Sequence, residues 1–157
     1  MAALRATPVT WRTARDRGYQ LEVPDTLSGS GTRDVPTEFR RVQTWAGYVC
    51  GDVHMMVSVN CFMRGRQSLD ETVAHDETFF RIDAAARDVD VAGSARAVRL
   101  EGTTRVLGPA GCERVLMVVA EADEVIALTL RAADRDDVAA VMDRIAQSFQ
   151  LANDPTQ

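Results

Sequence analysis

The chain of 157 residues is acidic, with a formal net charge of -5 at pH 7 and a pI of about 5.0. Because proteins that bind nucleic acids or anionic membranes without sequence preference are usually basic, this charge disfavours both classes. Hydrophobic residues make up 46% and charged residues 26%, as in ordinary globular proteins. The length predicts a single domain over residues 1–157, with a core at about 11–151 and a polar tail at 152–157.

All 18 basic residues are arginine, and the chain contains no lysine. This composition is typical of GC-rich genomes such as those of actinobacteria. It also has a chemical consequence, because Schiff-base lysines, lysine general bases and P-loop lysines are excluded as parts of a mechanism.

The cysteines and the N-terminal segment give an expectation for the compartment. Cys50, Cys61 and Cys112 are odd in number and show no C-x-x-C spacing, so we predict buried free thiols in a reducing environment. The first ten residues contain no apolar signal segment, and the longest apolar run, Val115–Ala120, is too short to span a membrane. We therefore expect a soluble, cytoplasmic protein, while an extracytoplasmic location stays open if a leader has been removed.

Alternating apolar residues predict strands in the first half of the chain. Pro24 ends one of them, because proline donates no amide hydrogen to a strand ladder. Asp25–Glu38 carries two glycines and Pro36, and we predict a long loop there. The predicted strands are Trp11–Ala14, Tyr19–Val23, Phe39–Val49 and Val53–Met63.

The pattern then changes to helical spacing. Ser68 and Glu71 form the S-x-x-E capping box, in which the two side chains satisfy otherwise unpaired amides at a helix start. Leu69, Val73 and Phe80 continue with helical spacing, so we predict a helix over about residues 69–86.

The last third of the chain reads as strands followed by a second helix. Strands are predicted at Val89–Ala92, Ala95–Arg105, Cys112–Ala120 and Val125–Arg131. The unbroken apolar runs 115–120 and 125–128 indicate a sheet covered on both faces. A helix is predicted over about residues 136–150, with Asp134 as its N-cap. Its apolar stripe consists of Val138, Val141, Met142, Ile145 and Phe149.

The order strands, helix, strands, helix predicts an α+β fold, in which two main helices pack on a mostly antiparallel, twisted sheet. Four segments also carry a resemblance: Gly18–Pro24, Ser68–Asp70, Val89–Ala97 and Ile145–Phe149. On these segments the chain resembles the PsbP/Mog-like family, which includes DcrB-type proteins, lipoproteins of the LpqN type and chaperones of secreted effectors. The resemblance implies an α/β/α sandwich and a non-enzymatic, accessory or partner-binding role. It carries over no functional residue.

Residue types that support catalysis or metal binding occur without the required patterns. His54, His75 and the three cysteines lack zinc-site spacing, and no H-E-x-x-H motif or calcium loop is present. There is no G-x-S-x-G nucleophile elbow, and the glycine-rich stretch 28–32 lacks a following lysine. His54 and Cys61 have opposite parity on one predicted strand and therefore point to opposite faces. We predict no metal, no cofactor and no enzymatic activity.

One face of the strand Val53–Met63 mixes polar and apolar residues: His54, Met56, Ser58, Asn60 and Phe62. If another layer covers this face, these residues belong to the core, an arrangement favoured by the neighbouring strands that read as buried on both sides. If the face is open, it offers an adaptable surface for a protein or peptide. Our first hypothesis is a partner-binding module. The alternative is a small-molecule carrier or sensor with a pocket between sheet and helix, and an enzyme is the third possibility.

Overall fold

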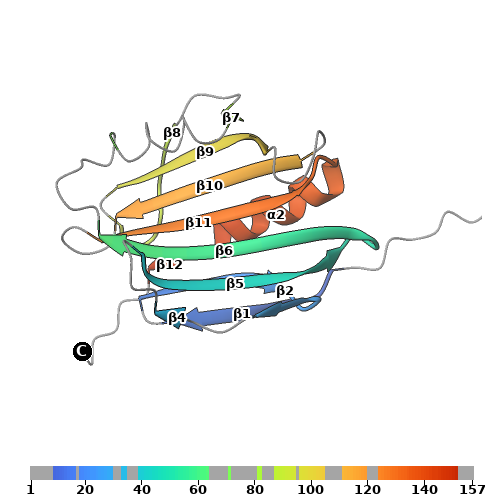
Figure 1. Ribbon diagram of the computed structural model, residues 1–157, viewed down its shortest axis with the longest axis horizontal. Helices are drawn as coiled ribbons and strands as arrows, with labels where there is room; N and C mark the ends of the chain where they lie inside the picture. Colours follow the sequence, from blue (N-terminus) through green and yellow to red (C-terminus); the bar gives the residue numbers. More distant parts are fainter. Residues whose placement is uncertain are drawn as a thin grey trace, which may run out of the picture.

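The computed structural model describes residues 9–16, 18–29, 33–34, 39–63, 71, 81–82, 87–94, 96–104, 111–119 and 124–151. Within these ranges the protein consists of two antiparallel β-sheets and helix α2 (Asp136–Ser148). Figure 1 shows the long strands of the larger sheet running across the molecule, with α2 behind them.

The larger sheet contains nine described strands in the order β3-β5-β6-β11-β10-β9-β7, with β4 beside β5 and β8 beside β9. The long central strands β5, β6, β11 and β10 follow one another as antiparallel neighbours. The strands are β3 (Leu27–Gly29), β4 (Arg33–Asp34), β5 (Phe39–Val49), β6 (Val53–Met63), β7 (Arg81–Ile82), β8 (Arg87–Val89), β9 (Ala97–Thr104), β10 (Gly111–Val119) and β11 (Glu124–Ala133).

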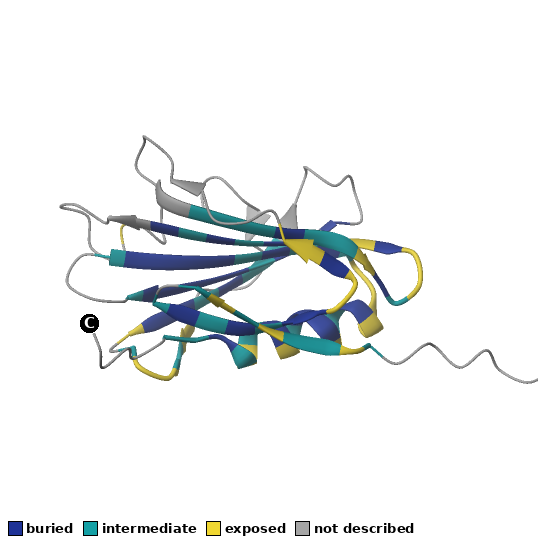
Figure 2. Cartoon of the chain, turned by 90° about the horizontal axis from the view of Figure 1, so that it is seen from below, coloured by how far each residue is buried: buried dark blue, intermediate teal, exposed yellow. Residues whose placement is uncertain are grey.

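The smaller sheet has the order β1-β2-β12 and is built from β1 (Trp11–Asp16), β2 (Tyr19–Pro24) and β12 (Gln150–Leu151). In Figure 2 this sheet and α2 lie on the same side of the larger sheet. The rings of Tyr19 and Phe149 stack with their centroids 5.8 Å apart, so the start of β2 is packed on the C-terminal end of α2. The two elements therefore form one layer.

The main core lies between this layer and the larger sheet. Every second residue of β6 from Val53 to Cys61 is at most 7% exposed, as the period of two predicts for a face turned to the core. The predicted stripe of α2 faces it, with Val138, Val141, Met142, Ile145 and Phe149 all buried. Burial of each large apolar side chain of this kind stabilises the folded state by about 1.5–3 kcal/mol.

The opposite face of the larger sheet carries a second buried cluster, made of Val98, Leu100, Val115, Met117, Val125 and Ala127. Since Val115–Val118 and Val125–Leu128 are buried at every position, β10 and β11 are covered on both faces. The interpretation of the two apolar runs is thereby confirmed for residues 115–118 and 125–128, whereas Val119 is half-buried and Ala120 lies outside the described residues.

The prediction of two main helices is not supported. Of residues 69–80 the structure describes only Glu71, which is helical, and the helix cannot extend to residue 86, because β7 (Arg81–Ile82) pairs with β9. Arg81 and Ile82 are extended because they gain ladder hydrogen bonds at the edge of the sheet. The few apolar residues after Val73 do not indicate this pairing.

Two predicted segments differ from the structure. Asp25–Glu38 is not a continuous loop, because β3 and β4 pair with β5 and Leu27 is buried to 1% exposure. Val89–Ala92 is not a strand beyond Val89: Ser94 donates its amide to Val91 O at 3.0 Å and closes a turn. In both cases contacts made by a few residues decide the structure and leave no periodic pattern.

Helix α2 begins where predicted and ends at Ser148, two residues earlier than expected. The N-cap is Arg135 and not Asp134, and no side chain caps the helix. Phe149 adopts an extended conformation at the C-cap, since Gln150 and Leu151 pair with β2. The predicted tail at 152–157 lies outside the described residues.

Candidate functional site

The mixed face of β6 lies on the second face of the larger sheet, next to the buried cluster of β9, β10 and β11. His54 is exposed, whereas Met56, Ser58 and Asn60 are half-buried. The side chain of Phe62, the fifth predicted residue, lies outside the described part. The strand thus marks the place where this face changes from apolar and covered to polar and partly accessible.

A pocket of about 180 Å³ opens on this face, lined by Met56, Ser58, Asn60, Thr129 and Arg131. The register explains why these residues meet, because Met56 lies opposite Arg131 and Ser58 lies opposite Thr129. Thr129 and Arg131 were missed in the sequence, where only the parity of β6 was considered. Their place beside β6 depends on the pairing of β6 with β11, about seventy residues away, which no pattern within either strand indicates.

The charge of Arg131, which lines this pocket, is balanced by a buried carboxylate. Arg131 donates from Nε to Glu113 Oε1 at 3.2 Å, and Glu113 is only 2% exposed. A buried carboxylate of this kind is stable only when a cation and hydrogen bonds compensate its charge. The pocket therefore offers neutral hydrogen-bonding groups, Ser58, Asn60 and Thr129, beside a compensated ion pair.

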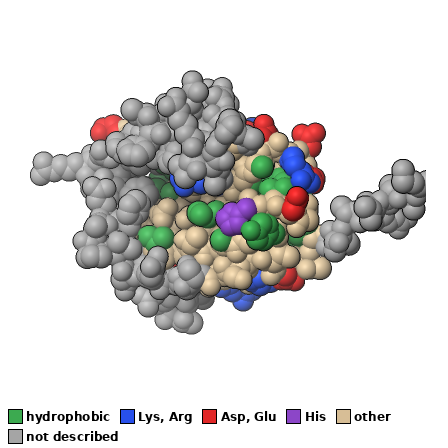
Figure 3. All heavy atoms as spheres, turned by 45° about the vertical axis from the view of Figure 1, so that its right-hand side comes forward, with side chains coloured by type: hydrophobic (Ala, Val, Ile, Leu, Met, Phe, Trp, Pro, Cys, Tyr) green, Lys and Arg blue, Asp and Glu red, His purple; other side chains and the backbone are tan. Residues whose placement is uncertain are grey.

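An aromatic pair stands at the end of the β5–β6 hairpin. Tyr48 and His54 are cross-strand partners, and their rings meet edge to face with centroids 5.5 Å apart. Tyr48 is 59% exposed and is the one exposed large hydrophobic residue in the described ranges. Figure 3 shows a histidine lying among hydrophobic side chains on this side of the molecule. Exposed aromatic groups of this kind are common anchors in protein interfaces.

The turn of this hairpin contains Cys50 in the left-handed region, with φ 52°, followed by Gly51 with φ 93°. Cys50 is half-buried and Cys61 is buried, and both are free thiols. Burial and the neighbouring Asp137 carboxylate raise the pKa of the Cys50 thiol, while Arg135 acts in the opposite direction. A thiol with a raised pKa is a weak nucleophile near neutral pH, so nothing here resembles an activated cysteine.

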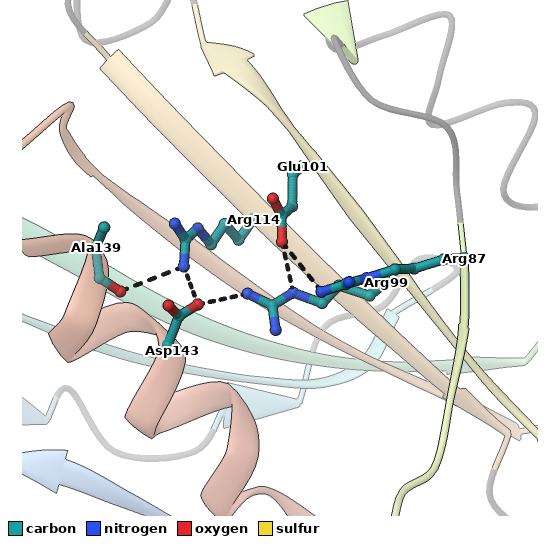
Figure 4. Close-up of polar contacts among 6 residues, drawn as sticks. All are labelled: Arg87, Arg99, Glu101, Arg114, Ala139 and Asp143. Carbon is teal, nitrogen blue, oxygen red and sulfur yellow. Dashed lines mark hydrogen bonds and ion pairs between the residues drawn. The ribbon is translucent and has the colours of Figure 1, made fainter. Parts of the chain in front are cut away.

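A cluster of charged residues joins α2 to the larger sheet (Figure 4). Asp143 of α2 accepts hydrogen bonds from Arg99 Nη2 of β9 at 2.6 Å and from Arg114 of β10. Glu101 pairs with Arg99 Nε at 2.9 Å and with Arg87 at 3.6 Å. The side chains of Arg99 and Arg114 are only 11% and 14% exposed, so this cluster fixes the position of the helix.

A second cavity, of about 220 Å³, lies between the larger sheet and the C-terminal end of α2. It is the feature that corresponds to the sheet–helix pocket of the alternative hypothesis. Its lining residues are Val89, Asp90, Val91, Ala92, Arg99, Leu116, Ala146, Gln147, Ser148, Phe149 and Gln150.

In the described ranges, no group of three or more His, Cys, Asp and Glu side chains is arranged to hold a metal ion. Among these ranges there is also no helix long and apolar enough to cross a bilayer.

Comparison with known proteins places the fold. Over 97% of its length the chain superposes on 98% of cyanobacterial PsbP (CyanoP) from Synechocystis sp. PCC 6803, with a TM-score of 0.60 and 13% identity. It likewise matches the Ran-binding protein Mog1p of Saccharomyces cerevisiae over 92% of this chain and 96% of that one, with a TM-score of 0.56 and 10% identity. The chain has the PsbP/Mog fold. The resemblance seen in the sequence is thereby confirmed for the fold.

No family profile matches the chain, and no curated protein sequence matches it. At 10–13% identity the PsbP/Mog fold establishes the backbone arrangement and transfers no activity or partner.

Proposed function

We propose that this protein is a non-enzymatic, single-domain module that binds a protein partner through the mixed face of β6 and the adjoining end of the β5–β6 hairpin. The observation that carries the proposal is the combination of an exposed aromatic pair, Tyr48 and His54, with a polar pocket beside it. One protein with this fold, Mog1p, is described as Ran-binding, and this supports the proposal that the partner is a protein.

The chemistry of this surface favours an extended segment of the partner. The aromatic pair provides exposed ring area against which an apolar or aromatic side chain can pack. Ser58, Asn60 and Thr129 supply hydroxyl and amide groups that can donate as well as accept hydrogen bonds. A neutral polar side chain, such as an amide or a hydroxyl, suits the pocket, because Glu113 already compensates the charge of Arg131.

Affinity capture from a lysate of the source organism tests the proposal. The wild type is compared with the double variant Tyr48→Ala/His54→Ala, and Thr13→Ala serves as the control because Thr13 is exposed on β1 of the other sheet. We expect a protein that the wild type and the control enrich equally and that the double variant loses by about tenfold or more, the effect of removing one strong interface anchor.

The captured protein is then purified and titrated by calorimetry against the wild type and the same two variants. Equal binding of the double variant, or no enrichment above a column without bait, contradicts the proposal. Since both substituted side chains are exposed, circular dichroism should show unchanged folding.

A further inference from the structure

The cavity at the C-terminal end of α2 is separate from the mixed face and has its own chemistry. Its walls come from β9 and β10, from the segment that follows β8, and from residues 146–150. Leu116 and Phe149 are 4% and 3% exposed and give it an apolar floor, whereas Asp90 and Gln147 are exposed and mark its opening.

Arg99 brings positive charge to this cavity. Its guanidinium group is held on two sides, by Asp143 at Nη2 and by Glu101 at Nε, and among the described residues Nη1 has no hydrogen bond or ion pair. Because Arg99 is largely shielded from water and lines the cavity, its remaining Nη1 can donate a charge-assisted hydrogen bond to an anionic group of a bound molecule.

Negative charge comes from a different part of the lining. Asp90 belongs to the segment after β8 and makes no hydrogen bond or ion pair with another described residue. The last turn of α2 contributes the negative end of the helix dipole, and no basic residue in that turn compensates it. The amides of Gln147 and Gln150 also line the cavity.

The volume limits the size of a ligand. At about 30 Å³ per water molecule, 220 Å³ corresponds to about seven waters, and hence to a molecule of about ten non-hydrogen atoms or fewer. A ligand that fits must combine an anionic group, a cationic group and a short apolar portion.

We propose that this cavity binds a small zwitterion, a free α-amino acid with an uncharged aliphatic side chain. Its carboxylate faces Arg99, its ammonium group faces Asp90 and the carbonyl end of α2, and its side chain lies against Leu116 and Phe149. This site is independent of the proposed partner-binding surface.

Nuclear magnetic resonance titration tests the assignment with three molecules of one shape: L-leucine, 4-methylpentanoate without the amine, and 3-methylbutylamine without the carboxylate. We expect L-leucine to shift the amide signals of Val91, Leu116 and Gln150 with a dissociation constant on the order of 0.1 mM, ordinary for so small a ligand. Each of the other two should bind about tenfold more weakly or worse, since each loses one charge contact.

Two variants, Ala146→Leu and Asp90→Asn, locate the binding, and Ala140→Leu is the control. Ala146→Leu fills the cavity from α2 and should abolish the shifts, whereas Ala140→Leu, on an exposed part of the same helix, should leave them unchanged. Asp90→Asn replaces an exposed side chain and should remove the preference for L-leucine over 4-methylpentanoate.

Three results would overturn the proposal. The first is an absence of shifts at about 20 mM L-leucine, which is far above the dissociation constant expected for this ligand size. The second is equal binding of all three molecules, and the third is binding that persists in Ala146→Leu. The amide spectrum reports the folding of each variant, and Asp90→Asn provides a test that does not depend on repacking the helix.

Discussion

Asp143 is the residue on which the attachment of α2 depends most directly. It accepts hydrogen bonds from two guanidinium groups of the sheet, and both arginine side chains are largely buried. A buried cation that loses its counter-ion keeps its desolvation cost without the compensating attraction. No sequence pattern indicates this role, because Asp143 occupies an ordinary polar position of an amphipathic helix.

Replacing Asp143 by Asn tests this point. We expect the free energy of unfolding to fall by about 1–3 kcal/mol, below the range for fully buried pairs because the Asp143 side chain is 42% exposed. Urea denaturation measures the change. Asp134→Asn, at an exposed position before the helix, serves as the control and should alter stability by about 0.5 kcal/mol or less. Equal effects of the two substitutions would argue against a special role for Asp143.

Asp137 links the start of α2 to the β5–β6 turn. The side chain of Arg135 hydrogen-bonds to Asp137 and lowers the pKa of that carboxyl, while Asp137 helps to raise the pKa of the Cys50 thiol. A carboxyl with a depressed folded-state pKa contributes stability above its unfolded pKa of about 3.9, and this contribution is lost as the pH falls through the folded value. The stability advantage over Asp137→Asn should therefore disappear in acid.

The same substitution should make Cys50 more reactive. Removing the carboxylate lowers the pKa of the Cys50 thiol, because burial then acts alone against the favourable charge of Arg135. We expect faster alkylation of Cys50 by iodoacetamide at pH 8 in Asp137→Asn than in the wild type, followed by peptide mass spectrometry. The buried Cys61 is the internal reference, and a rate at Cys50 that stays the same or falls would refute the link.

At the scale of elements, the long strands and α2 follow from sequence patterns, and the short strands do not. The bounds of β5 and β6 agree with the predicted Phe39–Val49 and Val53–Met63, because alternation over many residues leaves one consistent register. By contrast, β3 and β7 have three and two residues, too few for a pattern, and they exist because a long neighbour offers free ladder positions. These tertiary pairings explain the errors in the predicted loop and in the middle helix.

Gly47 shows how closely β3 approaches β5. Leu27 pairs with Gly47, and a Cβ at position 47 would collide with the carbonyl oxygen of Thr26 and lie 3.1 Å from Leu27 Cα. Gly47→Ala should displace β3 and lower the free energy of unfolding by about 1–3 kcal/mol. Thermal and urea denaturation measure this, with Ser28→Ala at an exposed position of β3 as the control. Unchanged stability of Gly47→Ala would contradict the close packing of these strands.

At the scale of the whole molecule, the two faces of the larger sheet differ in how far they are buried and in polarity. One face carries α2 and the smaller sheet and is engaged in the main core. The other changes along the strand order from the buried side chains of β9, β10 and β11 to the half-buried, polar side chains of β6. The sequence identified the mixed face of β6 through its parity. It could not identify Thr129 and Arg131, because their place beside β6 depends on a pairing between strands about seventy residues apart.

The central proposal is that a protein partner binds at the mixed face of β6, and site-specific photo-crosslinking in the source organism tests it most directly. A photoreactive amino acid replaces His54, which is exposed on this face, or Thr13, which is exposed on the smaller sheet. We predict that irradiation yields a covalent adduct with one defined protein from position 54 and none from position 13. The absence of an adduct at position 54, or the same adduct from both positions, would contradict the proposal.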